Sequence, residues 1–257
     1  MELKIAQIKE LFHYTPMEGQ QELIIRYQED ERSGVKNLVN HAEKKLKAWK
    51  REQNRIEGMK EYENRYQEYE LICGIDEVGR GPLAGPVVAG AVILPKDCDI
   101  LYLNDSKQLS EKQREELYLQ IQEKAVAVGL GCISAERIDE INILQATYEA
   151  MREAIRNLGM VPGLLLNDAV TIPGIEIPQI PIIKGDTKSI SIAAASIVAK
   201  VTRDRMMVEY DSLYPMYGFA SNKGYGAKVH QEALRQYGAS PIHRRSFIQK
   251  IMESERK

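Results

Sequence analysis

Four carboxylates in this sequence lie at the ends of short apolar segments, which is a pattern suited to metal chemistry. Asp76 and Glu77 follow residues 71–75, Asp168 follows 164–166, and Asp186 lies just past 180–183 on a glycine turn. An acid on an otherwise buried strand is unfavourable unless its charge is compensated. Two neighbouring carboxylates also resist being ionised together. A divalent cation relieves both penalties, and oxygen ligands favour Mg²⁺ or Mn²⁺.

The same residues have simpler interpretations. Asp76 and Glu77 also fit a hairpin whose acids lie in solvent, although Gly79 and Gly81 favour a ligand because backbone without a Cβ can approach one closely. Asp168 also fits a turn acid or a helix cap. If the four acids converge, they would hold two metal ions and support in-line displacement at phosphorus. Their spacing alone leaves convergence open.

The elements that must position these acids indicate an α/β domain. A strand, a turn and a second strand are followed by helices that alternate with strands, which predicts a mixed sheet flanked by helices. We expect strands over 71–75, 87–93, 125–133, 164–170 and 180–183. We expect helices over 111–125, 138–158, 191–210 and 228–237, with a last helix after 241.

Residues 1–70 differ in composition from residues 71–257, so we predict a helical N-terminal extension followed by the α/β domain. Apolar residues recur every three to four positions within 3–12 and 35–49, which predicts two or three amphipathic helices. Their alternating charges favour a solvated face on an extension that packs on the main domain or is independent of it. An accessory module that binds nucleic acid or a partner is the alternative.

Several basic residues are candidates for binding phosphate. Lys107 lies in a loop before a helix whose start is marked by Ser110 and Gln113, and such a helix N-terminus is a natural anion site. Lys200 and Arg203 share one face of the helix predicted over 191–210. They either present a basic edge to phosphates or are solvated helix charges paired with Asp204.

The C-terminal part adds an aromatic residue and a basic cluster. Tyr225 lies in a glycine-containing loop, where it is a lid, a platform for a base or sugar, or a packed loop residue. The run His243, Arg244 and Arg245 is the strongest local basic patch in the sequence. We assign His243 no catalytic role.

The composition excludes several classes of protein. The 257 residues carry a net charge of −2, so nucleic-acid binding would depend on a local patch. Three widely spaced cysteines, with no paired motif, argue against a disulfide framework or a zinc site and indicate a reducing compartment. We find no secretory signal and no membrane-spanning segment, and we expect a soluble cytoplasmic protein.

Five long motifs, in collinear order over residues 71–247, resemble bacterial ribonuclease HII, of the type 2 ribonuclease H family. They are GIDEVGRGPLAGPVVAGAVIL, NDSKQLSEKQRE, KGDTKSISIAAASIVAKVTRDR, YPMYGFASNKGYG and PIHRRSF. The resemblance implies a ribonuclease H-like mixed sheet with a helical C-terminal part. It also implies endonucleolytic hydrolysis of the RNA strand of RNA–DNA hybrids. Duplex DNA would be nicked on the 5′ side of embedded ribonucleotides, leaving 3′-hydroxyl and 5′-phosphate ends.

The resemblance also implies roles for individual residues, which we state as expectations. The family's four acids, which hold two Mg²⁺ or Mn²⁺ ions, match Asp76, Glu77, Asp168 and Asp186. The glycine-arginine-glycine backbone that senses the 2′-hydroxyl matches Gly79, Arg80 and Gly81, and the tyrosine that stacks on the neighbouring sugar matches Tyr225. Phosphate contacts would then come from Lys107, Lys200, Arg203, His243, Arg244 and Arg245.

Two departures and three alternatives accompany this interpretation. The extension lies outside the motifs, and Asn167 precedes Asp168 where an apolar residue is commoner in the family. The alternatives are a ribonuclease HIII-type enzyme, which Gly79–Gly81 and Tyr225 argue against, a non-catalytic hybrid-binding protein, and a metal nuclease acting on DNA alone. We expect a monomer with no membrane partner, and a replication clamp is a possible partner.

Overall fold

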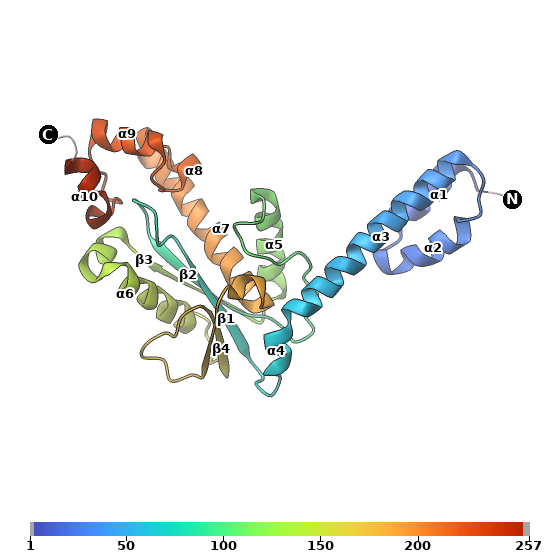
Figure 1. Cartoon of the computed structure of the whole chain (residues 1–257), viewed down its shortest axis with the longest axis horizontal. Coiled ribbons are helices and arrows are strands. Elements are labelled where there is room, and N and C mark those ends of the chain that lie inside the picture. Colours follow the sequence, from blue (N-terminus) through green and yellow to red (C-terminus); the bar gives the residue numbers. More distant parts are fainter. Residues whose placement is uncertain (1–2, 254–257) are drawn as a thin grey trace. The chain divides into compact units, whose positions relative to one another are not determined.

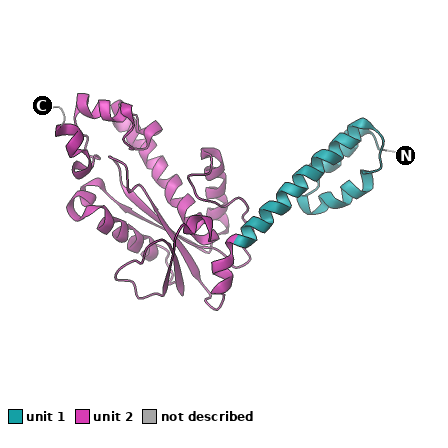
Figure 2. Cartoon of the chain, viewed as in Figure 1, with its two compact units in different colours: residues 1–58 teal, residues 59–257 magenta. Residues whose placement is uncertain are grey.

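The computed structural model describes residues 3–253, and the chain divides into two compact units, Met1–Gly58 and Met59–Lys257 (Figures 1 and 2). The division falls before the boundary that we expected at residue 70. Residues 59–70 belong to the second unit because they pack on it. Glu63, in α4 (Glu61–Arg65), accepts hydrogen bonds through Oε1 from Ser189 Oγ at 2.6 Å and from Ser191 N at 3.1 Å.

The first unit is helical, as the apolar spacing predicts. It contains α1 (Ile5–Tyr14), a 3₁₀ turn (Met17–Gly19), α2 (Gln20–Tyr27) and α3 (Ser33–Met59). One cluster of buried residues joins the three α-helices: Ile8, Ile24, Val35, Val39, Ala42 and Leu46. The stripe along α3 therefore faces an apolar core of this unit's own.

The second unit is built on a five-stranded sheet in the order β3-β2-β1-β4-β5. The strands are β1 (Ile72–Val78), β2 (Val87–Ile93), β3 (Ala127–Ile133), β4 (Leu164–Asp168) and β5 (Gln179–Ile182). β2 is antiparallel to β1 and to β3, whereas β4 is parallel to β1 and to β5. The predicted mixed sheet is confirmed, and β1 is its central strand.

Two long helices cover the sheet (Figure 1). α7 (Ile190–Leu213) packs on β1 and β2, and α6 (Ala135–Arg156) packs on β2 and β3. α5 (Glu111–Lys124) lies against α7. The C-terminal part is helical as expected, with α8 (Phe219–Asn222), α9 (Lys228–Tyr237) and α10 (Arg245–Glu253). Two 3₁₀ turns, Gly185–Thr187 and Pro215–Tyr217, flank α7.

α7 approaches the sheet so closely that only glycine fits on the facing strands at Gly74 and Gly90. A Cβ added at Gly74 would lie 2.0 Å from the carbonyl carbon of Ser191, and one at Gly90 would lie 2.5 Å from the carbonyl oxygen of Ala195. The first half of α7 is rich in alanine and serine and is buried, so backbone packs against backbone. Asp76 pairs with Gly90, and paired residues share a face of the sheet. The contact therefore brings the Asp76 side chain toward α7.

Within residues 3–253, every helix is too short or too polar to cross a lipid bilayer.

Two glycine substitutions test this backbone contact. Gly74→Ala should lower the free energy of unfolding by about 1–3 kcal/mol or more, because the added methyl cannot fit without moving α7 or β1. Gly58→Ala is the matched control, since nothing lies within 4 Å of a Cβ there and alanine favours helix. Denaturant unfolding measures both. Equal stability of Gly74→Ala and wild type would contradict the packing described.

Candidate active site

The ends of β1 and β4 bring the first three acids together. β1 and β4 are parallel, with Ile75 opposite Asn167, so Asp76 and Asp168 are the next residues on adjacent strands. Glu77 follows Asp76 on β1. The Asp76 carboxylate is 7 % exposed and accepts a hydrogen bond from Glu77 N at 2.7 Å. The strand register therefore places Asp76 and Asp168 side by side.

The fourth acid is held beside Asp168 by the turn that follows β5. Gly185 N donates to Asp168 Oδ1 at 2.8 Å, and Asp186 is the next residue. Ala169 and Lys184, which flank this contact, both have left-handed backbone, with φ of 56° and 57°. Non-glycine residues adopt this conformation only where the surroundings impose it. The turn is therefore fixed in a conformation that places Asp186 next to Asp168.

The carboxylates perturb one another electrostatically. Burial, then the charge of Glu77, raises the pKa of Asp76 well above its usual value, with a further contribution from Asp168. Burial also raises the pKa of Glu77, although Arg80 opposes this shift. The pKa of Asp186 rises to about 6 because of burial, then because of Asp105 and Asp168. Such shifts within one cluster are typical of functional sites.

These residues fit hard divalent cations. The donors are all carboxylate oxygens, which suit Mg²⁺ or Mn²⁺. Glu77 Oε2 is buried and has no hydrogen-bond partner among the described residues, while Oε1 meets Arg80 Nη1 at 3.2 Å. Within residues 3–253, no three acidic, histidine or cysteine side chains already form a closed ligand cage. Repulsion between uncompensated carboxylates would hold such a cage open.

A loop between β2 and α5 carries Lys107 and an acid, Asp105, that our sequence analysis did not count among the four acids. Asp105 lies close enough to raise the pKa of Asp186. The carboxylates of Asp105, Asp76 and Asp186 together outweigh burial and raise the pKa of Lys107. Lys107 therefore lies beside the acids. The motif Asn104–Lys107 was the available signal for Asp105, but no local pattern indicates that this loop lies near Asp186 in the turn after β5.

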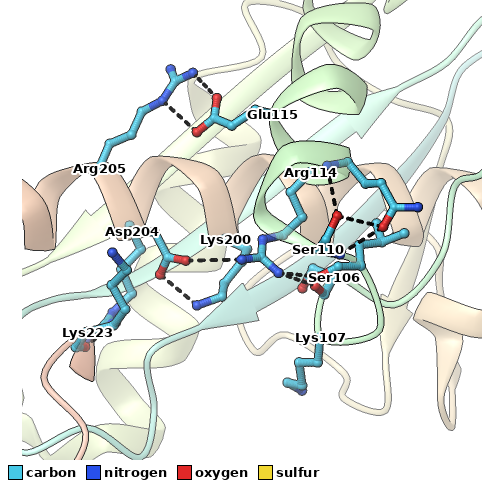
Figure 3. Close-up of polar contacts among 12 residues, drawn as sticks. Ser106, Lys107, Ser110, Arg114, Glu115, Lys200, Asp204, Arg205 and Lys223 are labelled. Atoms are coloured by element: carbon cyan, nitrogen blue, oxygen red, sulfur yellow. Dashed lines mark hydrogen bonds and ion pairs between the residues drawn. The ribbon is translucent and has the colours of Figure 1, made fainter. Parts of the chain in front are cut away.

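The loop is anchored to two helices. Arg114 Nη1 donates to the carbonyls of Ser106 at 3.1 Å and Leu109 at 2.6 Å, and Ser106 Oγ lies 2.9 Å from Ser196 Oγ on α7. The predicted cap is present, with Gln113 N donating to Ser110 Oγ at 3.3 Å. In Figure 3 the Lys107 side chain points away from the Ser106 and Arg114 contacts.

The turn after β1 lies against the loop that carries the tyrosine. Gly79 has φ of +89°, and a Cβ there would lie 2.2 Å from Arg203 Nε, so this position requires glycine. A Cβ at Gly81 would lie 3.9 Å from Tyr225 Cε1. The Tyr225 side chain is 43 % exposed. Gly81 and Tyr225, which are separated in sequence, therefore form one surface with an accessible aromatic ring.

The structure corrects the expected phosphate contact of Arg203 and favours, for Lys200, the alternative of a helix charge paired with Asp204. Arg203 is fully buried, and its guanidinium donates to the carbonyls of Pro86 and Lys223 at 2.9 Å and of Ala84 at 3.1 Å. Lys200 is largely buried in an ion pair with Asp204 at 2.6 Å (Figure 3). Arg203 therefore packs against the loops and Lys200 is paired within α7, so neither is a free cation for phosphate.

The basic cluster near the C-terminus also differs from the prediction. Arg244 is fully buried and His243 is 2 % exposed. Arg244 bonds to backbone carbonyls, and His243 Nε2 lies 2.9 Å from Nε2 of His230. Arg245 is exposed at the start of α10. The expected phosphate role therefore fails for His243 and Arg244. His230 was missed, since a single histidine on a short helix gives no signal of a buried partner.

Comparisons with known proteins match both parts of the chain. A family model described as Ribonuclease HII matches residues 73–250, and one described as Ribonuclease HII N-terminal domain matches residues 4–67. A curated protein named Ribonuclease HII from Lachnoclostridium phytofermentans is 62% identical over 251 residues, covering 98% of this chain and 99% of that protein.

Two solved archaeal structures share the fold. Ribonuclease H2 from Pyrococcus horikoshii is 31% identical with a TM-score of 0.61, over 73% of this chain and 99% of that one. The RNase HII in a PCNA:RNase HII complex from Archaeoglobus fulgidus is 26% identical with a TM-score of 0.57, over 72% of this chain and 97% of that one.

The perturbed acids predict how Asp76→Asn changes stability. A raised carboxyl pKa means that the folded state binds more protons than the unfolded state, so its contribution to stability falls as pH rises. In EDTA at pH 8, isosteric Asp76→Asn should therefore unfold at a higher temperature than wild type, by about 2–4 °C for each kcal/mol of repulsion removed. The difference in melting temperature should narrow as the pH is lowered, because protonation of wild-type Asp76 removes the same repulsion.

Thermal melting with and without Mg²⁺ provides the control. Added Mg²⁺ should stabilise wild type more than Asp76→Asn, because only wild type keeps the full set of acidic ligands. A variant that melts below wild type at pH 8 in EDTA would show that Asp76 is not under repulsion.

Proposed function

Because the chain belongs to the ribonuclease HII family and is an endoribonuclease of the ribonuclease H type, we propose that it hydrolyses the RNA strand of RNA–DNA hybrids and nicks duplex DNA on the 5′ side of an embedded ribonucleotide. The products would carry 3′-hydroxyl and 5′-phosphate ends. One observation carries the proposal. The carboxylates at the ends of β1 and β4, whose charges act on one another, lie beside the turn that contains Gly79–Gly81, and the Tyr225 ring lies next to Gly81.

The four carboxylates are the proposed ligands of two divalent cations. Asp76, Glu77, Asp168 and Asp186 supply only oxygen donors, and Glu77 Oε2 is free to bind. Bound Mg²⁺ or Mn²⁺ supplies Lewis-acid activation of water and phosphate for in-line displacement. Asp76 and Glu77 would be held in place by β1, and Asp168 by its hydrogen bond from Gly185.

Recognition of the ribonucleotide is assigned to the turn and the tyrosine. A 2′-hydroxyl both donates and accepts hydrogen bonds and distinguishes RNA from DNA, so the backbone of Gly79–Gly81 is a suitable reader. The exposed ring of Tyr225 would stack on the adjacent sugar. Lys107 would contact a phosphate, because its cationic side chain lies beside the acids that would bind the metal ions. Such a contact adds affinity rather than sequence preference.

The biological role that follows is removal of misincorporated ribonucleotides and RNA primers, in the cytoplasm and by a monomer. Binding to a replication clamp is an additional proposal, supported by the PCNA complex of the Archaeoglobus fulgidus protein.

Cleavage of two substrates by three proteins tests the function. Wild type, with Mg²⁺ or Mn²⁺, should nick a DNA duplex that contains one ribonucleotide and should also cleave a continuous RNA–DNA hybrid. Asp76→Asn should bind both but cleave neither, because it loses a metal ligand and no phosphate contact. Tyr225→Ala should lose about tenfold more kcat/KM on the single-ribonucleotide duplex than on the hybrid, since stacking contributes about 1–3 kcal/mol.

Substantial cleavage by Asp76→Asn would contradict the assignment of the acids. An equal loss by Tyr225→Ala on both substrates would remove the recognition role of the tyrosine while leaving the nuclease assignment in place.

A further inference from the structure

One backbone segment, residues 240–244, joins the two loops to which we assign ribonucleotide recognition. Gly85 N donates to the carbonyl of Ile242 at 2.8 Å, and Arg244 N donates to the carbonyl of Leu83 at 2.9 Å. Leu83 N in turn donates to the carbonyl of Gly224 at 2.8 Å. The segment therefore lies against the turn after β1, and that turn lies against the loop of Tyr225.

The Arg244 side chain fixes the backbone of the turn. Its guanidinium is fully buried and donates to the carbonyls of Gly79 at 2.5 Å, Arg80 at 2.9 Å, and Gly85 at 3.0 and 2.9 Å. A planar guanidinium holds its acceptors in a fixed fork geometry, whereas an ammonium is a compact charge with three rotatable donors. In a trans peptide the N–H points opposite the carbonyl. The N–H groups of Arg80 and Gly81 therefore point away from Arg244, free of its guanidinium.

His243, which precedes Arg244, is linked to the tyrosine loop through a second histidine, His230. Ser240 N donates to His243 Nδ1 at 3.0 Å, so the proton of a neutral His243 is on Nε2. His243 Nε2 then donates to His230 Nε2 at 2.9 Å. His230 must carry its proton on Nδ1, which donates to the carbonyl of Tyr225 at 2.8 Å. The two tautomers follow from one backbone N–H.

The surroundings keep this relay uncharged. The ring of Tyr217 lies 4.7 Å from that of His243, and the ring of Phe219 lies 5.3 Å from that of His230. Burial lowers the pKa of His243 to about 4 and also lowers that of His230. Neither imidazole is therefore charged near neutral pH. A proton added to His230 Nε2 would also place two N–H groups against each other.

We propose that Arg244 and His230 are positioning residues for ribonucleotide recognition. Arg244 sets the orientation of the Gly79–Gly81 backbone, and His230, oriented by His243, sets the height of Tyr225 above it. This inference rests on the proposed function. Selectivity for a single ribonucleotide then depends on buried side chains that do not touch the substrate.

Two substitutions of His230 separate the two ends of the relay. Asparagine places its amide nitrogen near the position of Nδ1, so His230→Asn keeps a donor for the Tyr225 carbonyl and loses the contact with His243. Glutamine reaches the position of Nε2, so His230→Gln keeps the contact with His243 and loses the one with Tyr225. We expect the ratio of kcat/KM on the single-ribonucleotide duplex to that on the hybrid to fall about tenfold in His230→Gln, the value of one buried hydrogen bond. His230→Asn should recover most of this loss.

Arg244→Lys tests the other end of the network. Lysine keeps the positive charge but replaces the fork that holds three carbonyls with a single ammonium. The same ratio should fall, mainly through kcat on the single-ribonucleotide duplex, because the turn is misplaced rather than its affinity for phosphate lost. Met151→Ala, a buried substitution in α6 distant from both loops in sequence, is the control. It should lower the melting temperature without altering the ratio.

The outcomes distinguish this inference from the proposed function. If wild type does not cleave the single-ribonucleotide duplex, the proposed function fails and the inference fails with it. If wild type cleaves and Tyr225→Ala loses selectivity, but His230→Gln and Arg244→Lys keep the wild-type ratio, only the inference is overturned. It is also overturned if His230→Gln and His230→Asn behave alike, or if all variants lose activity equally on both substrates, as a purely structural role would require.

Discussion

Repulsion among buried carboxylates is the constraint on which the rest of this structure depends. Asp76 is nearly enclosed, and burial together with the charges of Glu77 and Asp168 raises its pKa. The pKa of Asp186 is raised to about 6. Without compensation this arrangement opposes folding, since Asp76, Glu77 and Asp186 have raised pKa values and so a higher affinity for protons in the folded protein. The scaffold must therefore hold together a cluster that would otherwise separate. It does so with main-chain contacts that do not neutralise the charges.

The main-chain contacts are made by the parts of the sequence with the smallest side chains. Gly74 and Gly90 let α7 approach β1 and β2 at backbone distance, which brings Ser196 near Asp76 and fixes the loop of Ser106. The left-handed residues Ala169 and Lys184 close the turn between β4 and Asp186. Rigidity on one side of the cluster thus supports the open, charged side, where cations and a phosphate would bind.

The sequence predicted the elements well but not the direction in which its cations point. The strands, the long helices and the four acids were identifiable because apolar runs and glycine turns are local patterns. We expected Arg203 and Arg244 to contact phosphate because Arg203 shares a helix face with Lys200 and Arg244 lies in a basic run. Arg203 instead donates to the carbonyl of Pro86, and Arg244 to that of Gly85. Both acceptors lie far away in the sequence, so no local pattern reveals them. The packing of residues 59–70 on the second unit has the same origin, since Glu63 meets Ser189 only in the folded chain.

Crystals of the wild-type protein grown with Mn²⁺ would test the central claim most directly, through the anomalous scattering of the metal. The account predicts manganese between the carboxylates of Asp76, Glu77, Asp168 and Asp186, with Glu77 Oε2 among its ligands. Manganese bound elsewhere, or bound to Asp76 without either Asp168 or Asp186, would contradict it.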